Sequence, residues 1–271
     1  MDNRPIGVFD SGLGGLTVVR ELLQRLPHEN LIYFGDTGRV PYGSRSPAII
    51  RRFTLQNSRF LLNRGVKCII AACGTVSSVA SDLLSSLDVP AWGVVEPTAN
   101  AALAATKNGK IGVLGTTVTV QSRSFEIALQ QRREDIQVFA TACPVLVSLV
   151  ESGWIQSDNL ATETVLRRYL QPLIEQKVDT IVLGCTHFPL LSPIISRIMG
   201  DDVTLINSGE ACASYCKTLL QETDALSSQT ENGRCEFFVS DRPHNFINVA
   251  EMFLGRPVED DIKQIRVEDL P

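Results

Sequence analysis

Two short apolar stretches decide the fold: residues 66–75, VKCIIAACGT, and residues 178–187, VDTIVLGCTH. Each has the length and composition of a strand that is buried on both faces of a parallel sheet. Each run stops at a cysteine, Cys73 or Cys185, and a small or hydroxyl-bearing residue follows before a helical pattern resumes. Ligands of open parallel sheets bind beyond the carboxyl ends of the strands, so we predict that both thiols face one ligand. A helix N-terminus beside a thiol lowers its pKa, and we expect that effect at both cysteines.

The length and charge of the chain restrict its class. Its 271 residues suit one large or two medium α/β domains. The hydrophobic share of 44% and the charged share of 20% are ordinary for a soluble globular protein. The 25 Lys and Arg residues against 30 Asp and Glu residues give a formal net charge of −5. No nucleic acid partner is therefore expected, because phosphate binding requires a basic face.

The chain shows no signal for export or membrane insertion. Residues 1–5, MDNRP, lack the apolar core of a secretory signal and lead directly into a strand. No apolar run is long enough to span a bilayer. Seven cysteines without a dense framework fit a reducing cytoplasm better than secretion. We therefore expect a soluble, cytoplasmic protein without a membrane partner.

The N-terminal part of the chain alternates strands and helices. Strands are predicted at 5–10, 31–36 and 91–95, in addition to the one that ends at Cys73. Residues 37–46 form a loop that is too long for a simple βα turn, so they are a candidate binding loop. A helix follows from Ser46-Pro47, which has the order of a cap and a first helical position.

From Lys110 the pattern begins again. Residues 111–116, IGVLGT, echo residues 6–11, IGVFDS, and the next predicted strand covers 136–142. From Ile6 to Cys73 is 67 positions, and from Ile111 to Cys185 is 74. The helical sequence after Gly153 accounts for the longer spacing in the second part of the chain. Two halves with equivalent cysteines predict an α/β protein with pseudo-twofold symmetry and a cleft between the halves.

The C-terminal part is expected to return to the first half. A strand at 203–208 precedes a helix at 211–220, a strand at 234–240 and a last helix from Pro243. The predicted domains are therefore residues 1–97 plus 207–271, which carry Asp10 and Cys73, and residues 98–206, which carry Cys185 and His187.

Two thiols on opposite sides of a small ligand suit the inversion of a stereocentre. One group removes a proton from one face of a carbon while the other protonates the opposite face, and the roles exchange in the reverse direction. Thiols have pKa values close enough to neutrality to act as general acid and base. Asp10 should lie beside Cys73 if the first and third strands are neighbours. His187 follows Cys185 by two positions, and Glu151 could orient it or balance its charge.

The other motifs favour structural roles. Free cysteine is among the most buried residue types, so Cys68, Cys143 and Cys235 are interpreted as structural. Cys212 and Cys216 share a helix face but lack the further ligands of a zinc site, so no metal is predicted. The glycine-rich turn at 12–15 departs from a dinucleotide-binding motif at Thr17, and no Gly-Lys-Ser/Thr follows.

Seven segments together resemble one family over nearly the full chain. They are residues 6–18 (IGVFDSGLGGLTV), 35–37 (GDT), 41–44 (PYGS), 93–97 (GVVEP), 142–144 (ACP), 149–153 (LVESG) and 183–191 (LGCTHFPLL). In this order they resemble the glutamate racemases of the aspartate/glutamate racemase superfamily.

The resemblance implies an isomerase that interconverts L- and D-glutamate without a cofactor and supplies D-glutamate for bacterial peptidoglycan. It implies two flavodoxin-like domains with the active site between them, and a homodimer. By the same resemblance Cys73 works on D-glutamate and Cys185 on L-glutamate, with Asp10, His187 and Glu151 as further catalytic candidates. The implied substrate-binding residues are Asp10, Ser11, Pro41, Tyr42, Gly43, Gly74, Thr75, Thr116, Thr119, Thr186 and His187.

One departure from the family concerns the first cysteine. The family usually reads Ala-Cys-Asn-Thr-Ala, whereas residues 72–76 read ACGTV. The missing Asn side chain is a substrate contact in the family, and a hydrogen bond to a charged group contributes about 1.5–3 kcal/mol. Water could replace it if Gly74 leaves room. We therefore expect weaker substrate binding or altered specificity. A racemase of another small acidic amino acid, or a weakly active or non-catalytic paralogue, remains the alternative; a related decarboxylase is disfavoured by the second cysteine.

Overall fold

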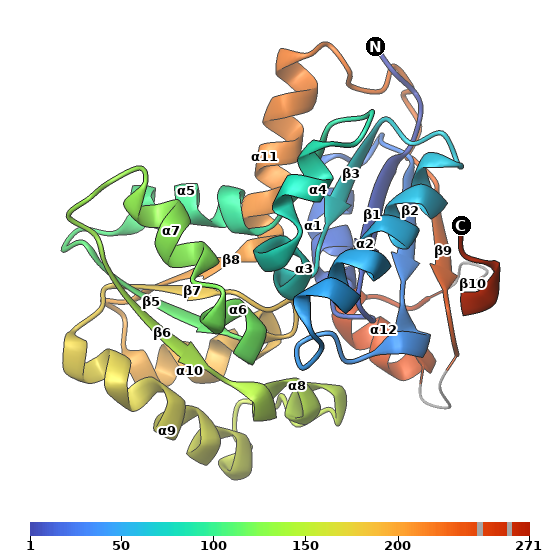
Figure 1. The fold of residues 1–271 in the computed structure, drawn as a ribbon. Helices are drawn as coiled ribbons and strands as arrows, with labels where there is room; N and C mark the ends of the chain where they lie inside the picture. Colours follow the sequence, from blue (N-terminus) through green and yellow to red (C-terminus); the bar gives the residue numbers. More distant parts are fainter. Residues whose placement is uncertain (243–245, 259–261) are drawn as a thin grey trace.

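The computed structural model describes residues 1–242, 246–258 and 262–271. Its strands form two parallel sheets, and helices cover both faces of each (Figure 1). The first sheet has the order β10-β9-β2-β1-β3-β4 and consists of β1 Ile6–Asp10, β2 Leu31–Gly35, β3 Cys68–Ala71, β4 Ala91–Gly93, β9 Cys235–Val239 and β10 Ile262–Gln264. The second has the order β6-β5-β7-β8 and consists of β5 Lys110–Gly115, β6 Gln137–Ala142, β7 Thr180–Leu183 and β8 Thr204–Asn207. Below, the first half is the part of the chain around the first sheet, and the second half is the part around the second.

The helices connect the parallel strands and cover them. The α-helices are α1 Leu16–Arg25, α2 Pro47–Leu62, α3 Gly74–Val79, α4 Ser81–Ser85, α5 Val95–Ala105, α6 Thr117–Gln121, α7 Ser124–Gln130, α8 Pro144–Glu151, α9 Leu160–Gln176, α10 Ser192–Met199, α11 Ser208–Glu222 and α12 Phe246–Leu254. Three short 3₁₀ turns are η1 Thr37–Arg39, η2 Phe188–Leu191 and η3 Val267–Asp269. In the described parts of the chain, no helix has the length and apolar character that crossing a bilayer requires.

The two sheets share one strand order, which confirms the internal repeat. In the first sheet β1 lies between β2 and β3, and in the second β5 lies between β6 and β7. This is the beginning of the flavodoxin-like order, in which the first strand is central and ligands bind where the order reverses. β1 and β3 are neighbours with Phe9 opposite Ala71, so Asp10 and the turn that carries Cys73 follow adjacent strands, as predicted.

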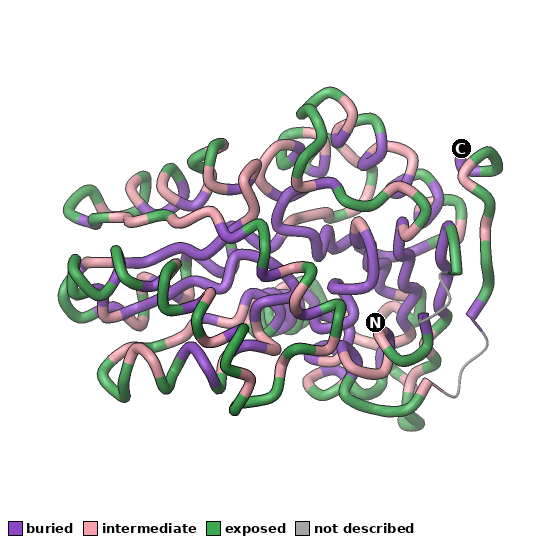
Figure 2. Tube along the Cα trace, turned by 90° about the horizontal axis from the view of Figure 1, so that it is seen from below, coloured by how far each residue is buried: buried purple, intermediate pink, exposed green. Residues whose placement is uncertain are grey.

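Buried apolar runs account for the central strands. Every residue of β1, β2, β3 and β7 is buried, as a parallel sheet covered on both faces requires. Figure 2 shows these strands as a buried centre with exposed helices around it. One cluster of buried apolar side chains runs through both halves, from Ile6 and Val8 to Leu114 and Leu183. The core is therefore continuous between the sheets.

The predicted strands and helices are largely confirmed, with differences at their ends. β3 and β7 each end two residues before the cysteine, at Ala71 and Leu183. β9 pairs in parallel with β2, so the C-terminal part does return to the first sheet. The short strand β10 was not predicted. The expected helix start at Pro243 lies outside the described residues.

The predicted domain boundaries remain a prediction. Strands of the first sheet come from residues 6–93 and 235–264, and those of the second from residues 110–207. Helix α5 extends across the boundary at 97/98, and β8 ends at Asn207.

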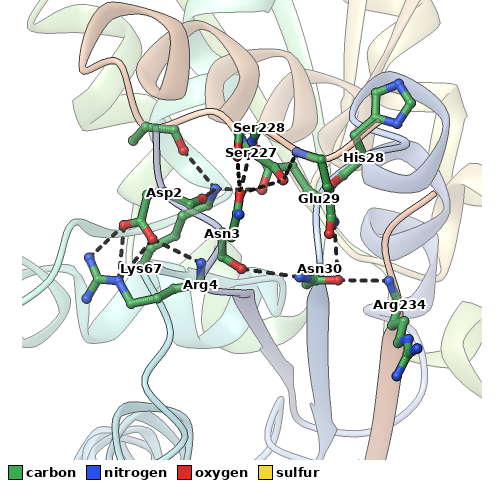
Figure 3. A network of polar contacts seen from close by, with 12 residues as sticks. Asp2, Asn3, Arg4, His28, Glu29, Asn30, Lys67, Ser227, Ser228 and Arg234 are labelled. Carbon is green, nitrogen blue, oxygen red and sulfur yellow. Dashed lines mark hydrogen bonds and ion pairs between the residues drawn. The ribbon is translucent and has the colours of Figure 1, made fainter. Parts of the chain in front are cut away.

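A buried ion pair between Lys67 and Glu29 lies at the amino-terminal ends of strands β2 and β3 in the first sheet (Figure 3). The side chains of Lys67 and Glu29 are each 2% exposed, and Nζ of Lys67 lies 2.5 Å from Oε2 of Glu29. Nζ also donates to the carbonyl oxygens of Asp2 and Ala225 at 2.8 Å. The backbone N–H of Ser227 donates to Oε1 of Glu29 at 2.8 Å. This network holds the N-terminus and the segment after α11 against the starts of β2 and β3.

Candidate active site

A cavity of about 420 Å³ lies where the carboxyl ends of the two sheets meet. Strand-end turns of both halves contribute to it, as the repeat predicts. Most of the predicted site residues line it: Ser11, Pro41, Tyr42, Gly43, Cys73, Gly74, Thr75, Thr116, Glu151, Cys185, Thr186 and His187. The geometry therefore brings both cysteines to one cavity.

Two predicted site residues lie just behind the cavity wall. Asp10 is 1% exposed and Thr119 is 1% exposed, and neither lines the cavity. Thr119 contacts the lining indirectly, since its hydroxyl lies 3.0 Å from Oγ1 of Thr116. Asp10 ends β1 beside the first cysteine turn. Their roles in substrate binding remain predictions.

Cys73 is the N-cap residue of α3 and is 5% exposed. Its thiol donates to Oγ of Ser11 at 3.4 Å. Burial, together with the negative charge of Asp10, raises the pKa of Cys73 to about 12. The expectation of a lowered pKa was wrong here, because removal of the thiolate from water outweighs the few N–H groups of a six-residue helix. Cys73 is thus a neutral thiol at neutral pH.

The second cysteine has a charged partner. Sγ of Cys185 lies 3.7 Å from Nδ1 of His187, and Nε2 of His187 lies 3.0 Å from Oε1 of Glu151. Burial lowers the pKa of His187, but the hydrogen bonds with Cys185 and Glu151 outweigh it and raise this pKa to about 10. At neutral pH His187 is therefore an imidazolium that donates to both neighbours. The sulfur of Cys185 therefore lies beside a positive charge.

Asp10 has one carboxylate oxygen fixed and one free. Oδ2 accepts from the backbone N–H groups of Gly12 at 3.2 Å and Gly15 at 2.9 Å. Within the described chain, Oδ1 is buried without a hydrogen-bond partner. Burial raises the pKa of Asp10, although the N–H groups of Gly15 and Gly12 and the charge of His187 oppose this. A buried oxygen without a partner is costly, so Oδ1 is available to a donor that enters the site.

Two threonine hydroxyls connect the halves at the cavity wall. Oγ1 of Thr75, at the start of α3, lies 3.1 Å from Oγ1 of Thr116, which ends the β5 turn. Thr116 caps α6, and its Oγ1 accepts from the backbone N–H of Thr119 at 3.2 Å. Hydroxyls and helix-start N–H groups are donors suited to a carboxylate.

Gly74 lies against the opposite cysteine turn. A Cβ atom at this position would lie 2.2 Å from the carbonyl oxygen of Gly184. Real Cβ atoms do not come this close to a backbone oxygen. The expectation that Gly74 leaves room for a water molecule is therefore wrong on the side of Gly74 that faces Gly184. Gly14 makes a similar approach, where a Cβ would lie 2.3 Å from Oγ1 of Thr186. These glycines allow the two halves to meet closely.

The loop that follows β2 is anchored by buried Asp36. Its Oδ2 accepts from Nε of Arg39 at 2.7 Å and from the hydroxyl of Tyr42, and its Oδ1 accepts from Oγ of Ser240 at 2.8 Å. Asn57 of α2 donates to the Tyr42 hydroxyl at 3.2 Å. Polar contacts of Asp36, Asn57 and Ser240 therefore hold the candidate binding loop. The tip of the loop, residues 40–44, lines the cavity.

Some lining residues were not predicted. They are Gly12, Thr117, Pro144, Val147, Ser148 and Gly184. Val40 and Ser44 also line the cavity and belong to the predicted binding loop at 37–46. Positions 144, 147, 148 and 151 follow helical spacing, so one face of α8 lines the cavity. That periodicity was available in the sequence and would have identified Val147 and Ser148 from Glu151.

The chemical character of the site is polar but poor in cations. Of the residues that the structure describes, no lysine or arginine lines this cavity, and His187 and Glu151 are its charged pair. In the same parts of the chain, no cluster of three or more His, Cys, Asp or Glu residues could hold a metal ion. Anionic groups of a ligand must therefore be held by N–H groups and hydroxyls.

Comparison with known proteins agrees with this geometry. The profile of the Asp/Glu/Hydantoin racemase family matches residues 6–216. The chain belongs to this family. As a member of these racemases it is an isomerase, and the family fold is its two-sheet α/β architecture.

Relatives and solved structures support the assignment over the full chain. A glutamate racemase of Geobacter metallireducens is 42% identical over 266 residues, which cover 98% of this chain and 97% of that protein. The glutamate racemase isoform RacE1 of Bacillus anthracis has a TM-score of 0.93 at 36% identity, with all of both chains covered. The glutamate racemase of Francisella tularensis, solved in complex with D-glutamate, has a TM-score of 0.90 at 35% identity and 98% coverage of each chain.

Proposed function

We propose that the chain is a glutamate racemase that interconverts L- and D-glutamate without a cofactor, with Cys73 and Cys185 as the two acid–base groups. The observation that carries the proposal is that both thiols, from equivalent turns of two sheets, line one cavity. Relatives named glutamate racemase support the choice of substrate.

The two thiols have different polar and charged neighbours, and we use this difference to assign their protonation before a turnover. The Cys185 sulfur lies beside the imidazolium of His187, while burial raises the pKa of Cys73, which holds its proton beside Ser11. In the L-to-D direction, the Cys185 thiolate takes the Cα proton and leaves a carbanion. The Cys73 thiol then gives its proton to the opposite face. The turnover leaves Cys185 as a thiol and Cys73 as a thiolate, which is the protonation that the reverse direction requires. Before a second L-to-D turnover, Cys73 must regain a proton and Cys185 must lose one.

The remaining predicted residues have roles in binding. The hydroxyls of Thr75 and Thr116 and the N–H groups at the starts of α3 and α6 suit the substrate carboxylates. The free Oδ1 of Asp10 suits the substrate ammonium, if that group reaches the cavity wall beside Cys73. Glu151 positions His187 through their hydrogen bond.

The cellular role is proposed on the same basis. We propose a cytoplasmic homodimer that supplies D-glutamate for peptidoglycan, with domains at residues 1–97 plus 207–271 and at residues 98–206. The proposal involves no nucleic acid and no membrane partner.

Solvent exchange at Cα tests the chemistry. In D₂O, we expect the protein to exchange the Cα proton of both L- and D-glutamate and to racemise each. Cys73→Ala and Cys185→Ala should each abolish racemisation while leaving the thermal unfolding midpoint close to that of the wild type. Cys212→Ala, which removes a buried thiol outside the cavity, is the matched control.

The alternatives give different results in the same experiment. Faster exchange with aspartate than with glutamate would indicate a racemase of another small acidic amino acid. Exchange of glutamate without inversion would mean that one half of the site is inactive. No exchange with either amino acid would reject the racemase proposal and favour a non-catalytic paralogue.

A further inference from the structure

A second cavity adjoins the cavity that Cys73 and Cys185 line, which is called the cysteine cavity below. It has a volume of about 600 Å³ and lies between the loop before α2 and helix α6. Gly43, Ser44 and Thr117 line both cavities. Because the two cavities share these walls, the second one lies beside the cysteine cavity on the side of the loop tip.

Arg45 is the charged residue of this second cavity. The other described residues that line it are uncharged. Arg45 is exposed, and its guanidinium makes no hydrogen bond or ion pair to any residue that the structure describes. Its backbone is nevertheless fixed, since its N–H donates to the carbonyl oxygen of Tyr42 at 2.9 Å and Tyr42 is held by Asp36. The backbone of Arg45 is thus fixed at the rim of the second cavity, and its guanidinium is an exposed cation without a partner among the described residues.

The charges around the two cavities leave Arg45 unbalanced. In the cysteine cavity the imidazolium of His187 is offset by Glu151 at 3.0 Å. Among the described residues that line the two cavities, Arg45 is then the cation without an anionic partner. Free glutamate carries two carboxylates and one ammonium and has a net charge of −1 at neutral pH. The whole chain has a formal charge of −5 and would repel such an anion without a local cation.

We propose that Arg45 is a specificity-determining residue that attracts net-anionic substrates to the cysteine cavity through its charge. This proposal rests on the proposed glutamate racemisation. Arg45 does not line the cysteine cavity, so it acts through Coulomb attraction at a distance and takes no part in proton transfer. Such an attraction lowers KM for both enantiomers, leaves kcat unchanged, and weakens as salt screens it.

Kinetics of charge variants test the proposal. With Arg45→Ala at low ionic strength, we expect KM for L- and D-glutamate to rise about three- to tenfold, with kcat changed less than about twofold. Arg45→Lys keeps the charge and should keep a KM close to that of the wild type. The ratio of the two KM values, Arg45→Ala to wild type, should approach one as ionic strength rises from about 0.01 M to about 1 M, because the Debye length falls from about 30 Å to about 3 Å.

Arg59→Ala is the matched control. Arg59 is also exposed and makes no side-chain bond to a described residue, but it lines neither cavity. The proposal is rejected if Arg45→Ala changes KM no more than Arg59→Ala does at low ionic strength. It is also rejected if Arg45→Lys is as impaired as Arg45→Ala, or if the KM ratio is independent of salt. Wild-type protein that fails to racemise glutamate would instead reject the proposed function.

Discussion

Cys73 and Cys185 follow equivalent strands, yet different polar and charged groups surround their thiols. Cys73 has a hydroxyl, a buried carboxylate and little solvent around its thiol, and its pKa is raised to about 12. Cys185 has an imidazolium beside its sulfur. The folded protein thus keeps one thiol protonated and places a cation beside the other. The asymmetry comes from single side chains rather than from the repeated backbone.

At the residue scale, the charge on His187 depends on Glu151. Glu151→Gln removes the carboxylate that accepts from Nε2, so the pKa of His187 should fall from about 10 toward its ordinary value of 6.5. The hydrogen bond with Cys185 also raises this pKa, so the fall is partial and the variant loses the imidazolium at a lower pH than the wild type does. We expect the alkaline limb of kcat/KM for L-glutamate to shift to lower pH. NMR titration of the His187 ring measures the pKa directly, and Glu151→Asp, which keeps the charge, is the control. An unchanged His187 titration in Glu151→Gln would contradict the assignment.

Gly74 carries a second prediction at this scale. In Gly74→Ala the new Cβ would meet the carbonyl oxygen of Gly184 at 2.2 Å, so the cysteine turns must separate. A misplacement of about 1 Å can cost about 10²-fold in rate, and we expect a loss of kcat/KM of that order. Gly74→Asn should lose activity in the same way, although the family usually has Asn there. Steady-state kinetics with thermal unfolding of each variant checks this, and a Gly74→Asn variant as active as the wild type would refute it.

At the element scale, the sequence predicted what depends on local pattern. Buried strands such as β3 and β7, and the repeat that relates them, follow from apolar runs and their spacing. Strand β10 was not predicted, because only Ile262 of its three residues is apolar and buried. The close approach of Gly74 to Gly184 joins positions 110 residues apart, so no local pattern encodes it. The pKa of Cys73 was predicted with the wrong sign because burial is a property of the assembled fold.

The buried pair at the starts of β2 and β3 gives the prediction at this scale. Lys67→Met would leave the carboxylate of Glu29 buried without its cation, which typically costs about 3–5 kcal/mol in the free energy of unfolding. Lys263→Met is a matched control, since Lys263 pairs with Glu236 at 2.7 Å but both side chains are about half exposed. The control should cost about 0–1 kcal/mol. Urea unfolding measures both, and equal costs would contradict the role of the buried pair.

At the scale of the whole molecule, the halves are joined by more than the cavity. The hydroxyls of Ser78 and Ser124 bond across them at 2.9 Å, and Oγ1 of Thr17 lies 3.2 Å from the carbonyl oxygen of Thr186. Helix α11 packs against α1 of the first half and α5 at the start of the second. The apolar cluster that contains Ile6 also contains Leu183. Loss of packing in one half therefore exposes apolar surface of the other.

This shared core predicts that both halves unfold in one cooperative transition, although the chain is longer than most two-state proteins. The two tryptophans provide one probe in each half, because Trp92 lies in β4 and Trp154 follows α8. Trp154→Phe leaves Trp92 as the sole reporter of the first half, and Trp92→Phe leaves Trp154 as that of the second. Each variant is compared with circular dichroism of the same sample, so that any stability change from the substitution affects both probes equally. We expect fluorescence and dichroism midpoints in urea to coincide within each variant. Separate midpoints would show that the sheets unfold independently, and that the continuous core does not couple them.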